Sequence, residues 1–71
     1  MKLLEYRKKE NKIQKEMAEL LGVSLDVYNS WEYGKRIPTR NNMKNIVRKT
    51  NGEVQPNDFY YEGDNNGRAN I

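Results

Sequence analysis

The side chains best suited to recognising another molecule are gathered in one short stretch of the chain. Ser24, Asn29 and Ser30 carry hydroxyl and amide groups that both donate and accept hydrogen bonds. Asp26 can only accept them, and Leu25 offers an apolar surface. The 71 residues include no histidine and no cysteine, so the commonest acid/base catalyst is excluded, and these side chains favour recognition over bond breaking.

An enzyme is the class of protein that the sequence supports least. Acidic and basic residues stand at spacings expected of solvated helix faces, with no glycine-rich phosphate loop and no nucleophile beside a base. Without cysteine and histidine, disulfides and zinc fingers are excluded as well. We expect no catalytic residues, no metal, no cofactor and no small-molecule substrate.

An all-α fold must position the recognition side chains. Apolar residues at three- and four-residue spacing, bounded by capping residues and glycines, predict helices over residues 2–10, 14–21, 24–33 and about 40–49. A single turn at 56–59 should follow. We expect one domain over residues 1–61 and a disordered polar tail over 62–71, where Gly, Asp, Asn and Arg dominate.

The twenty residues from Gln14 to Tyr33 fit two helices joined by a tight turn and packed at a steep angle. Gly22 can take the positive φ that such a turn needs, and Tyr28 and Trp31 can bury one side of the second helix. Its outward flank would then carry Ser24, Leu25, Asp26, Asn29, Ser30 and Tyr33. An ordinary helical hairpin would use the same apolar spacing and is the alternative.

These segments resemble the Xre-type helix-turn-helix family of phage Cro and repressor proteins. The residues that carry the likeness are QKEMAELLGVS, WEYGKRIP and TNGEVQPNDF, and it covers about residues 2–60. The resemblance implies a compact, four- to five-helix, lambda-repressor-like domain that binds double-stranded DNA sequence-specifically and regulates transcription. Such proteins usually act as homodimers on palindromic operators.

On that basis the outward flank of residues 24–33 lies along the major groove, and its base-reading residues are Ser24, Leu25, Asp26, Asn29 and Ser30. The Asn29 amide could pair with adenine, Leu25 could contact a thymine methyl, and Ser30 could donate or accept. Asp26 has two open interpretations. It accepts a hydrogen bond from a cytosine amino group, or it only stabilises the positive end of its own helix.

Gln14 stands at the start of the second helix, where its side chain and the neighbouring backbone amides can hold a phosphate. Further phosphate contacts are expected from Lys12, Lys15, Tyr33, Lys35, Arg36, Arg40 and Lys44. Residues 1–52 hold twelve Lys and Arg against six Asp and Glu, a net charge of +6, whereas residues 53–71 carry −3. A basic body suits a polyanionic partner. A plain solvated helical surface is the alternative.

The resemblance also implies a partly buried salt bridge between Arg7, seven residues before Gln14, and Glu32, next to Trp31. The sequence departs from the family just before Gln14, where Lys12 and Ile13 replace a hydrophobic residue and a capping Ser, Thr or Asn. The missing cap should weaken the second helix by about 1 kcal/mol or shift its start. Val27 and Tyr28 also replace a Thr and a smaller aliphatic residue.

A protein-interaction module on the same fold, such as an antirepressor or a toxin-antitoxin partner, is the rival function, since Leu25, Asp26 and Val27 give an apolar and acidic start to the recognition helix. We expect a cytoplasmic location without membrane contact, because no apolar run approaches the length of a bilayer and no secretory signal is seen. A homodimer surface would involve the fourth helix and residues 54–61. There Val54, Phe59, Tyr60 and Tyr61 either meet a second copy or cover the core.

Overall fold

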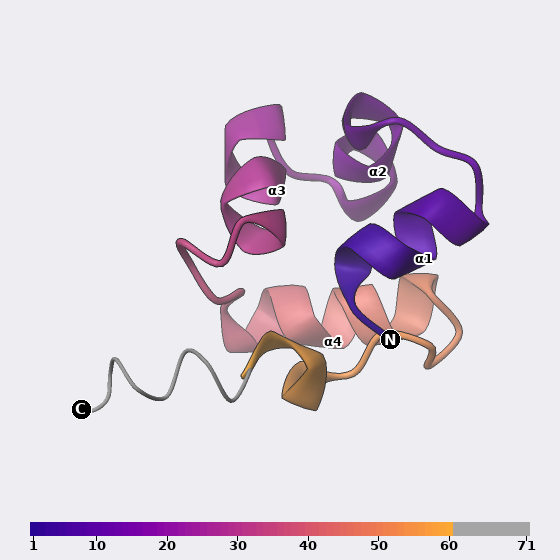
Figure 1. The fold of residues 1–71 in the computed structure, drawn as a ribbon. Helices are drawn as coiled ribbons and strands as arrows, with labels where there is room; N and C mark the ends of the chain where they lie inside the picture. The colour runs from indigo at the N-terminus through magenta and orange to yellow at the C-terminus, as the bar shows by residue number, and fades with distance from the viewer. Residues whose placement is uncertain (61–71) are drawn as a thin grey trace.

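Four α-helices and one short 3₁₀ helix make up the described part of the protein. The computed structural model describes residues 1–60. Its elements are α1 (Leu3–Lys9), α2 (Gln14–Leu21), α3 (Leu25–Glu32), α4 (Arg40–Lys49) and the 3₁₀ helix η1 (Pro56–Phe59). α2 packs against both α3 and α4, and α1 packs against α3 (Figure 1). The all-α prediction is confirmed, and the bounds of the predicted helices are correct to within one residue.

Side-chain oxygens close the N-terminal ends of the helices in two ways. Ser24 and Thr39 accept hydrogen bonds from the backbone N–H groups of Val27 and Asn42 and so cap α3 and α4. α2 begins at Gln14 although Ile13 cannot cap it. There the Glu16 carboxylate accepts a hydrogen bond from the N–H of Ile13 at 2.9 Å. Of the two expected consequences of the missing cap, a shifted start of α2 is therefore wrong, and a weaker second helix stays a prediction.

The turn between α2 and α3 depends on Gly22. Its φ of 71° and ψ of 31° lie in the left-handed region, where glycine has no steric penalty. The N–H of Val23 then donates to the carbonyl of Ala18, and the side-chain amide of Asn45 in α4 donates to the carbonyl of Leu21. These bonds satisfy carbonyls that the end of α2 leaves free, and they tie the turn to α4.

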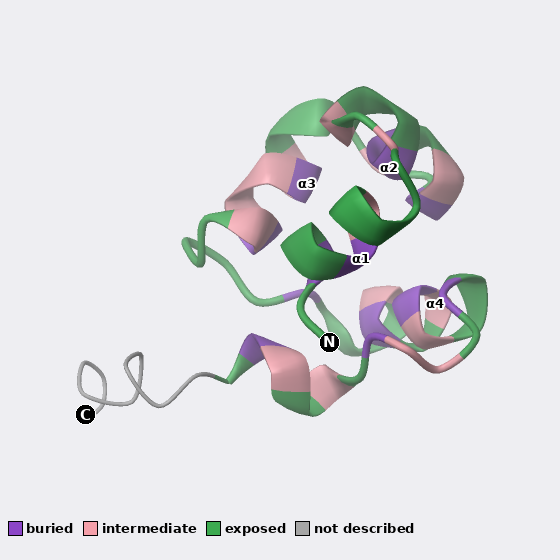
Figure 2. Cartoon of the chain, turned by 45° about the vertical axis from the view of Figure 1, so that its right-hand side comes forward, coloured by how far each residue is buried: buried purple, intermediate pink, exposed green. Residues whose placement is uncertain are grey.

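The core lies between the helices and is built around two aromatic rings of α3. Tyr28 and Trp31 are 0% and 3% exposed, and their ring centroids lie 6.5 Å apart in an edge-to-face arrangement. Each helix turns buried residues toward this core and exposed ones away from it (Figure 2). The other apolar residues of this core are Leu3, Tyr6, Met17, Ala18, Leu21, Met43, Ile46, Val54 and Phe59.

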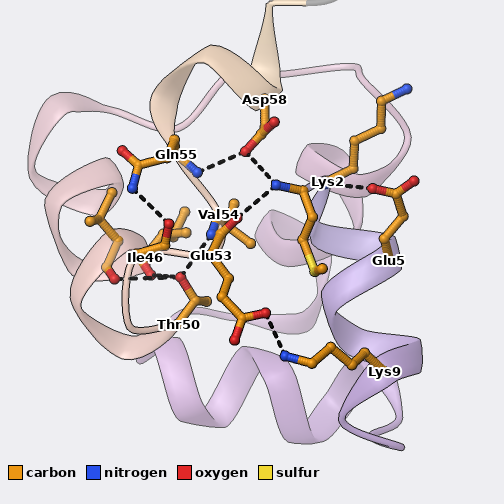
Figure 3. A network of polar contacts seen from close by, with 12 residues as sticks. Lys2, Glu5, Lys9, Ile46, Thr50, Glu53, Val54, Gln55 and Asp58 are labelled. Atoms are coloured by element: carbon orange, nitrogen blue, oxygen red, sulfur yellow. Dashed lines mark hydrogen bonds and ion pairs between the residues drawn. The ribbon is translucent and has the colours of Figure 1, made fainter.

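Thr50 is a fully buried polar residue that joins α4 to the segment after it. Its hydroxyl donates to the carbonyl of Ile46 at 2.8 Å and accepts from the N–H of Val54 at 3.1 Å (Figure 3). Val54 is thereby held in the core. Nearby, the amino group of Met1 contacts the carbonyl of Glu53 and the carboxylate of Asp58, so the first residue of the chain lies against η1.

Val54 and Phe59 are buried in the core of their own chain. Of the two roles considered, covering the core and contacting a second copy, they have the first. Tyr60 is 55% exposed. Tyr61 and the predicted tail, residues 62–71, lie outside the described residues. Among residues 1–60, no helix is both long and apolar enough to span a membrane.

Candidate functional site

α3 presents two flanks of opposite character. Tyr28 and Trp31 hold one flank in the core, as predicted. On the other flank Ser24, Leu25 and Asp26 are exposed at the start of the helix, and Tyr33 is exposed just past its end. Figure 2 shows the first turn of α3 in the colour of exposed residues. The buried rings fix the helix, and the exposed first turn is free to meet another molecule.

The carboxylate of Glu32 is the polar anchor of α3. Its side chain is 2% exposed. Arg7 of α1 donates to it from Nε at 2.7 Å and from Nη2 at 3.3 Å, and the hydroxyl of Tyr28 also donates to it. The structure thus brings Arg7 and Glu32 together, joining α1 to α3. Tyr28, which the sequence predicted only as a buried ring, adds a donor that its phenol group could have suggested.

These hydrogen bonds change the ionisation of the groups involved. Burial raises the pKa of Glu32, but hydrogen bonds from Arg7, Tyr28 and Gln14 outweigh it and hold the pKa below its usual value. The hydrogen bond with Glu32 raises the pKa of Arg7, while burial, followed by the same carboxylate, raises the pKa of Tyr28. Glu32 and Arg7 are therefore charged, and Tyr28 is neutral, throughout the neutral pH range.

Gln14 belongs to the same cluster. Its Nε2 donates to Oε1 of Glu32 at 2.9 Å, so the first residue of α2 is tied to the last residue of α3. The sequence predicts that this side chain contacts a DNA phosphate. An amide –NH₂ carries two hydrogens. One is directed at Glu32, which leaves the second, together with the backbone N–H groups at the start of α2, for such a contact.

Two of the predicted base-reading residues have polar atoms that are buried or already hydrogen-bonded within the protein. The Oδ1 atom of Asn29 is buried without a hydrogen-bond partner among the described residues. In this conformation Asn29 cannot offer both ends of its amide to an adenine, and that expectation needs the side chain to turn. The Ser30 hydroxyl donates to the carbonyl of Val27 at 2.6 Å, so in this conformation its oxygen can accept a hydrogen bond but its proton is already committed.

A hollow of about 260 Å³ lies beside the outer flank of α3. Asp26, Val27 and Ser30 line it from the helix, and Lys35 and Arg36 line it from the turn that follows. This hollow brings an acidic residue, a hydroxyl and two basic residues to one place.

The other predicted cationic contacts are spread more widely. Lys15 is exposed on α2, and Lys12 is half-buried, with its carbonyl accepting from Nη1 of Arg7 at 3.2 Å. Arg40 and Lys44, one helical turn apart on α4, line a different hollow of about 370 Å³ with Met43, Val47, Gln55 and Pro56. Of the six basic residues expected to contact phosphates, Lys35 and Arg36 are thus the two that line the hollow beside α3.

A family model described as helix-turn-helix matches residues 3–56, which span all four α-helices. Neither curated proteins nor solved structures give a match. The matched segment contains α2, α3, the turn at Gly22 and the cluster around Glu32, so the match falls on the site described above.

Proposed function

The chain belongs to the Xre/Cro-type helix-turn-helix family of DNA-binding regulators, and we propose that it is a Cro-like repressor that reads a specific sequence in the major groove of double-stranded DNA with residues 24–33. The observation that carries the proposal is the division of α3 into an anchored flank, with Tyr28 and Trp31, and an exposed first turn. A helix used in this way must be rigid, because base contacts require its side chains to be held in register with the base edges.

The exposed residues at the start of α3 supply contacts to bases. The oxygen of Ser24 accepts from the N–H of Val27, which leaves its proton free to donate to a base or phosphate. Leu25 has no hydrogen-bonding group, and a thymine methyl is its natural contact. Ser30 acts as an acceptor, and Asn29 contributes once its amide turns outward.

Phosphate contacts hold the protein in place beside these bases. Gln14 donates one amide hydrogen to Glu32 and the other to a phosphate. This side chain therefore links the position of the DNA backbone to the position of α3. Lys35, Arg36 and the exposed phenol of Tyr33 contact the strand near the C-terminal end of α3. Lys12, Lys15, Arg40 and Lys44 contribute to the positive potential around them.

The regulator acts as a homodimer on a palindromic operator, because one short helix spans only a few base pairs and two half-sites multiply the specificity. Val54 and Phe59 are buried in the core of their own chain and are not available for a dimer contact. The contact therefore involves the apolar hollow between α4 and η1, which Met43, Val47 and Pro56 line, and the exposed ring of Tyr60.

Selection from a random duplex library, with this protein as bait, tests the proposal. We expect a palindrome whose half-sites lie about 10 base pairs apart, centre to centre. On the selected duplex, log affinity should fall linearly with log salt concentration, with a slope of about −0.9 for each phosphate contacted. A slope near zero, or no binding to any duplex, would contradict the proposal.

A matched pair of double variants locates the contacting face. Lys35→Ala with Arg36→Ala should make the salt slope shallower by up to about two. Lys8→Ala with Lys49→Ala removes the same charge from exposed positions of α1 and α4 and should leave the slope close to that of the wild type. Equal effects in the two variants would mean that the face was assigned wrongly.

A protein-interaction module is the second candidate, and the exposure of Leu25 beside Asp26 favours it. An apolar and an acidic residue at the tip of a recognition helix would suit a protein surface. This function predicts that duplex DNA is not bound, or is bound without dependence on salt, so the same titration distinguishes the two candidates.

A further inference from the structure

We propose that Asp26 selects a cytosine in each half-site, its carboxylate accepting a hydrogen bond from the cytosine amino group. This inference rests on the proposed DNA binding and deepens it by naming one base. It starts from the hollow beside α3, which Asp26 and Val27 line together with Lys35 and Arg36.

The backbone holds the two basic residues in place beside α3. The N–H groups of Lys35 and Arg36 both donate to the carbonyl of Ser30, at 2.9 and 3.2 Å. Ser30 itself lines the hollow, one turn of helix after Asp26. The turn that carries the two cations is therefore fixed against the same helix that carries the carboxylate.

The cations resolve the difficulty of placing a carboxylate close to DNA. Alone at the tip of α3, Asp26 would be repelled by the phosphates, and nearby charges of opposite sign offset that repulsion. With Lys35 and Arg36 in the same hollow, the local charge is positive even with Asp26 ionised. The carboxylate can therefore approach the groove and still accept hydrogen bonds.

The major-groove edge of a C·G pair matches this arrangement of charges. Cytosine presents an amino donor there, from which the Asp26 carboxylate can accept while Lys35 and Arg36 remain on the phosphates. Adenine also presents an amino donor, but its N7 acceptor lies beside that donor and would repel a carboxylate. The polar groups that thymine and guanine present in the major groove are acceptors only, so neither base can donate to a carboxylate. Val27 adds an apolar surface that tolerates the C–H edge of cytosine.

Two substitutions of Asp26 give different expectations. Asn at this position pairs with adenine through both ends of its amide, so Asp26→Asn should change the selected base from cytosine to adenine. Asp26→Ala should remove the preference. Asp26 is exposed, so both variants should fold, and circular dichroism checks this. Glu19→Gln makes the same change of charge at an exposed position of α2 that does not line the hollow, and is the control.

The variants are compared by library selection and by competition among four duplexes that differ only at the selected position. The wild type and Glu19→Gln should prefer cytosine about tenfold over the other bases, the cost expected of one mismatched pair. Asp26→Ala should bind the four duplexes within about twofold of one another.

Outcomes that overturn the inference can be told apart from those that overturn the proposed function. If the wild type selects a palindrome and both Asp26 variants keep its preference at every position, Asp26 reads no base. A lower melting temperature with an unchanged preference would assign Asp26 to the positive end of its own helix instead. If neither the wild type nor the variants bind duplex DNA at low salt, both the inference and the proposed function are wrong.

Discussion

Arg7 provides the most direct test of how α3 is anchored. Arg7→Ala removes the guanidinium that donates twice to the buried carboxylate of Glu32 and once to the carbonyl of Lys12. Gln14 and Tyr28 still donate to Glu32 in the variant. The carboxylate keeps its charge but loses the group that balances it.

The structure sets the size of the effect. Removing one partner of a buried salt bridge costs about 3 to 5 kcal/mol, because the other charge is left uncompensated. Glu32 is 2% exposed, but Arg7 is 18% exposed and two donors remain, so we expect the lower end, about 3 kcal/mol. For a domain of this size, that loss lowers the melting temperature by about 12 to 24 °C.

Urea unfolding, followed by circular dichroism and by the fluorescence of the buried Trp31, measures the difference in free energy. Lys9→Ala is the matched control, since it breaks an exposed ion pair between α1 and Glu53 and should cost little. The two variants remove one basic residue each from the same helix. A loss of stability in Arg7→Ala no larger than that in Lys9→Ala would refute the reasoning.

Three further predictions concern stability. The pKa of Glu32 is lower in the folded protein than its usual value of 4.5. The stability that ionised Glu32 contributes is therefore fully present above pH 4.5 and is lost as the pH falls through the pKa of the folded state. Melting temperature should therefore fall more steeply with acidification in the wild type than in Glu32→Gln, as measured by circular dichroism. Ser24→Ala removes the cap of α3 and should cost about 1 kcal/mol in urea unfolding, whereas Ser24→Gly should cost only a few tenths. Thr50→Val keeps the shape of the side chain but leaves the N–H of Val54 without its acceptor, so it should cost about 1 to 3 kcal/mol and more than Thr50→Ser, with equal losses counting against this role of the hydroxyl.

The helices could be predicted because their signals are local. Ser24 and Thr39 mark the starts of α3 and α4, and Gly22 marks the end of α2, through bonds to residues at most four positions away. Tyr28 and Trp31 are three residues apart, which places both on one side of any helix. Such signals do not depend on the rest of the fold.

The details that sequence reasoning missed depend on side-chain conformation. The spacing in α3 turns Asn29 away from Trp31, yet rotation about its side-chain bonds buries Oδ1. The capping residue expected before α2 is absent at Ile13, but Glu16, three residues later, accepts a hydrogen bond from the N–H of Ile13 and so holds the start of the helix. That carboxylate was a signal in the sequence, because a glutamate at the third helical position commonly bonds back to the residue before the helix.

The two acidic residues of α3 have opposite relations to the fold. Glu32 is buried and joins α1, α2 and α3, so a change there alters both stability and the position of Gln14. Asp26 is exposed, and its carboxylate lies by a hollow instead of in the core. Substitution of Asp26 should therefore change which DNA is bound without a large loss of stability, whereas substitution of Glu32 should weaken binding to all sequences together with the fold. This separation follows from burial, since a buried charge that loses its partners costs free energy that an exposed one does not.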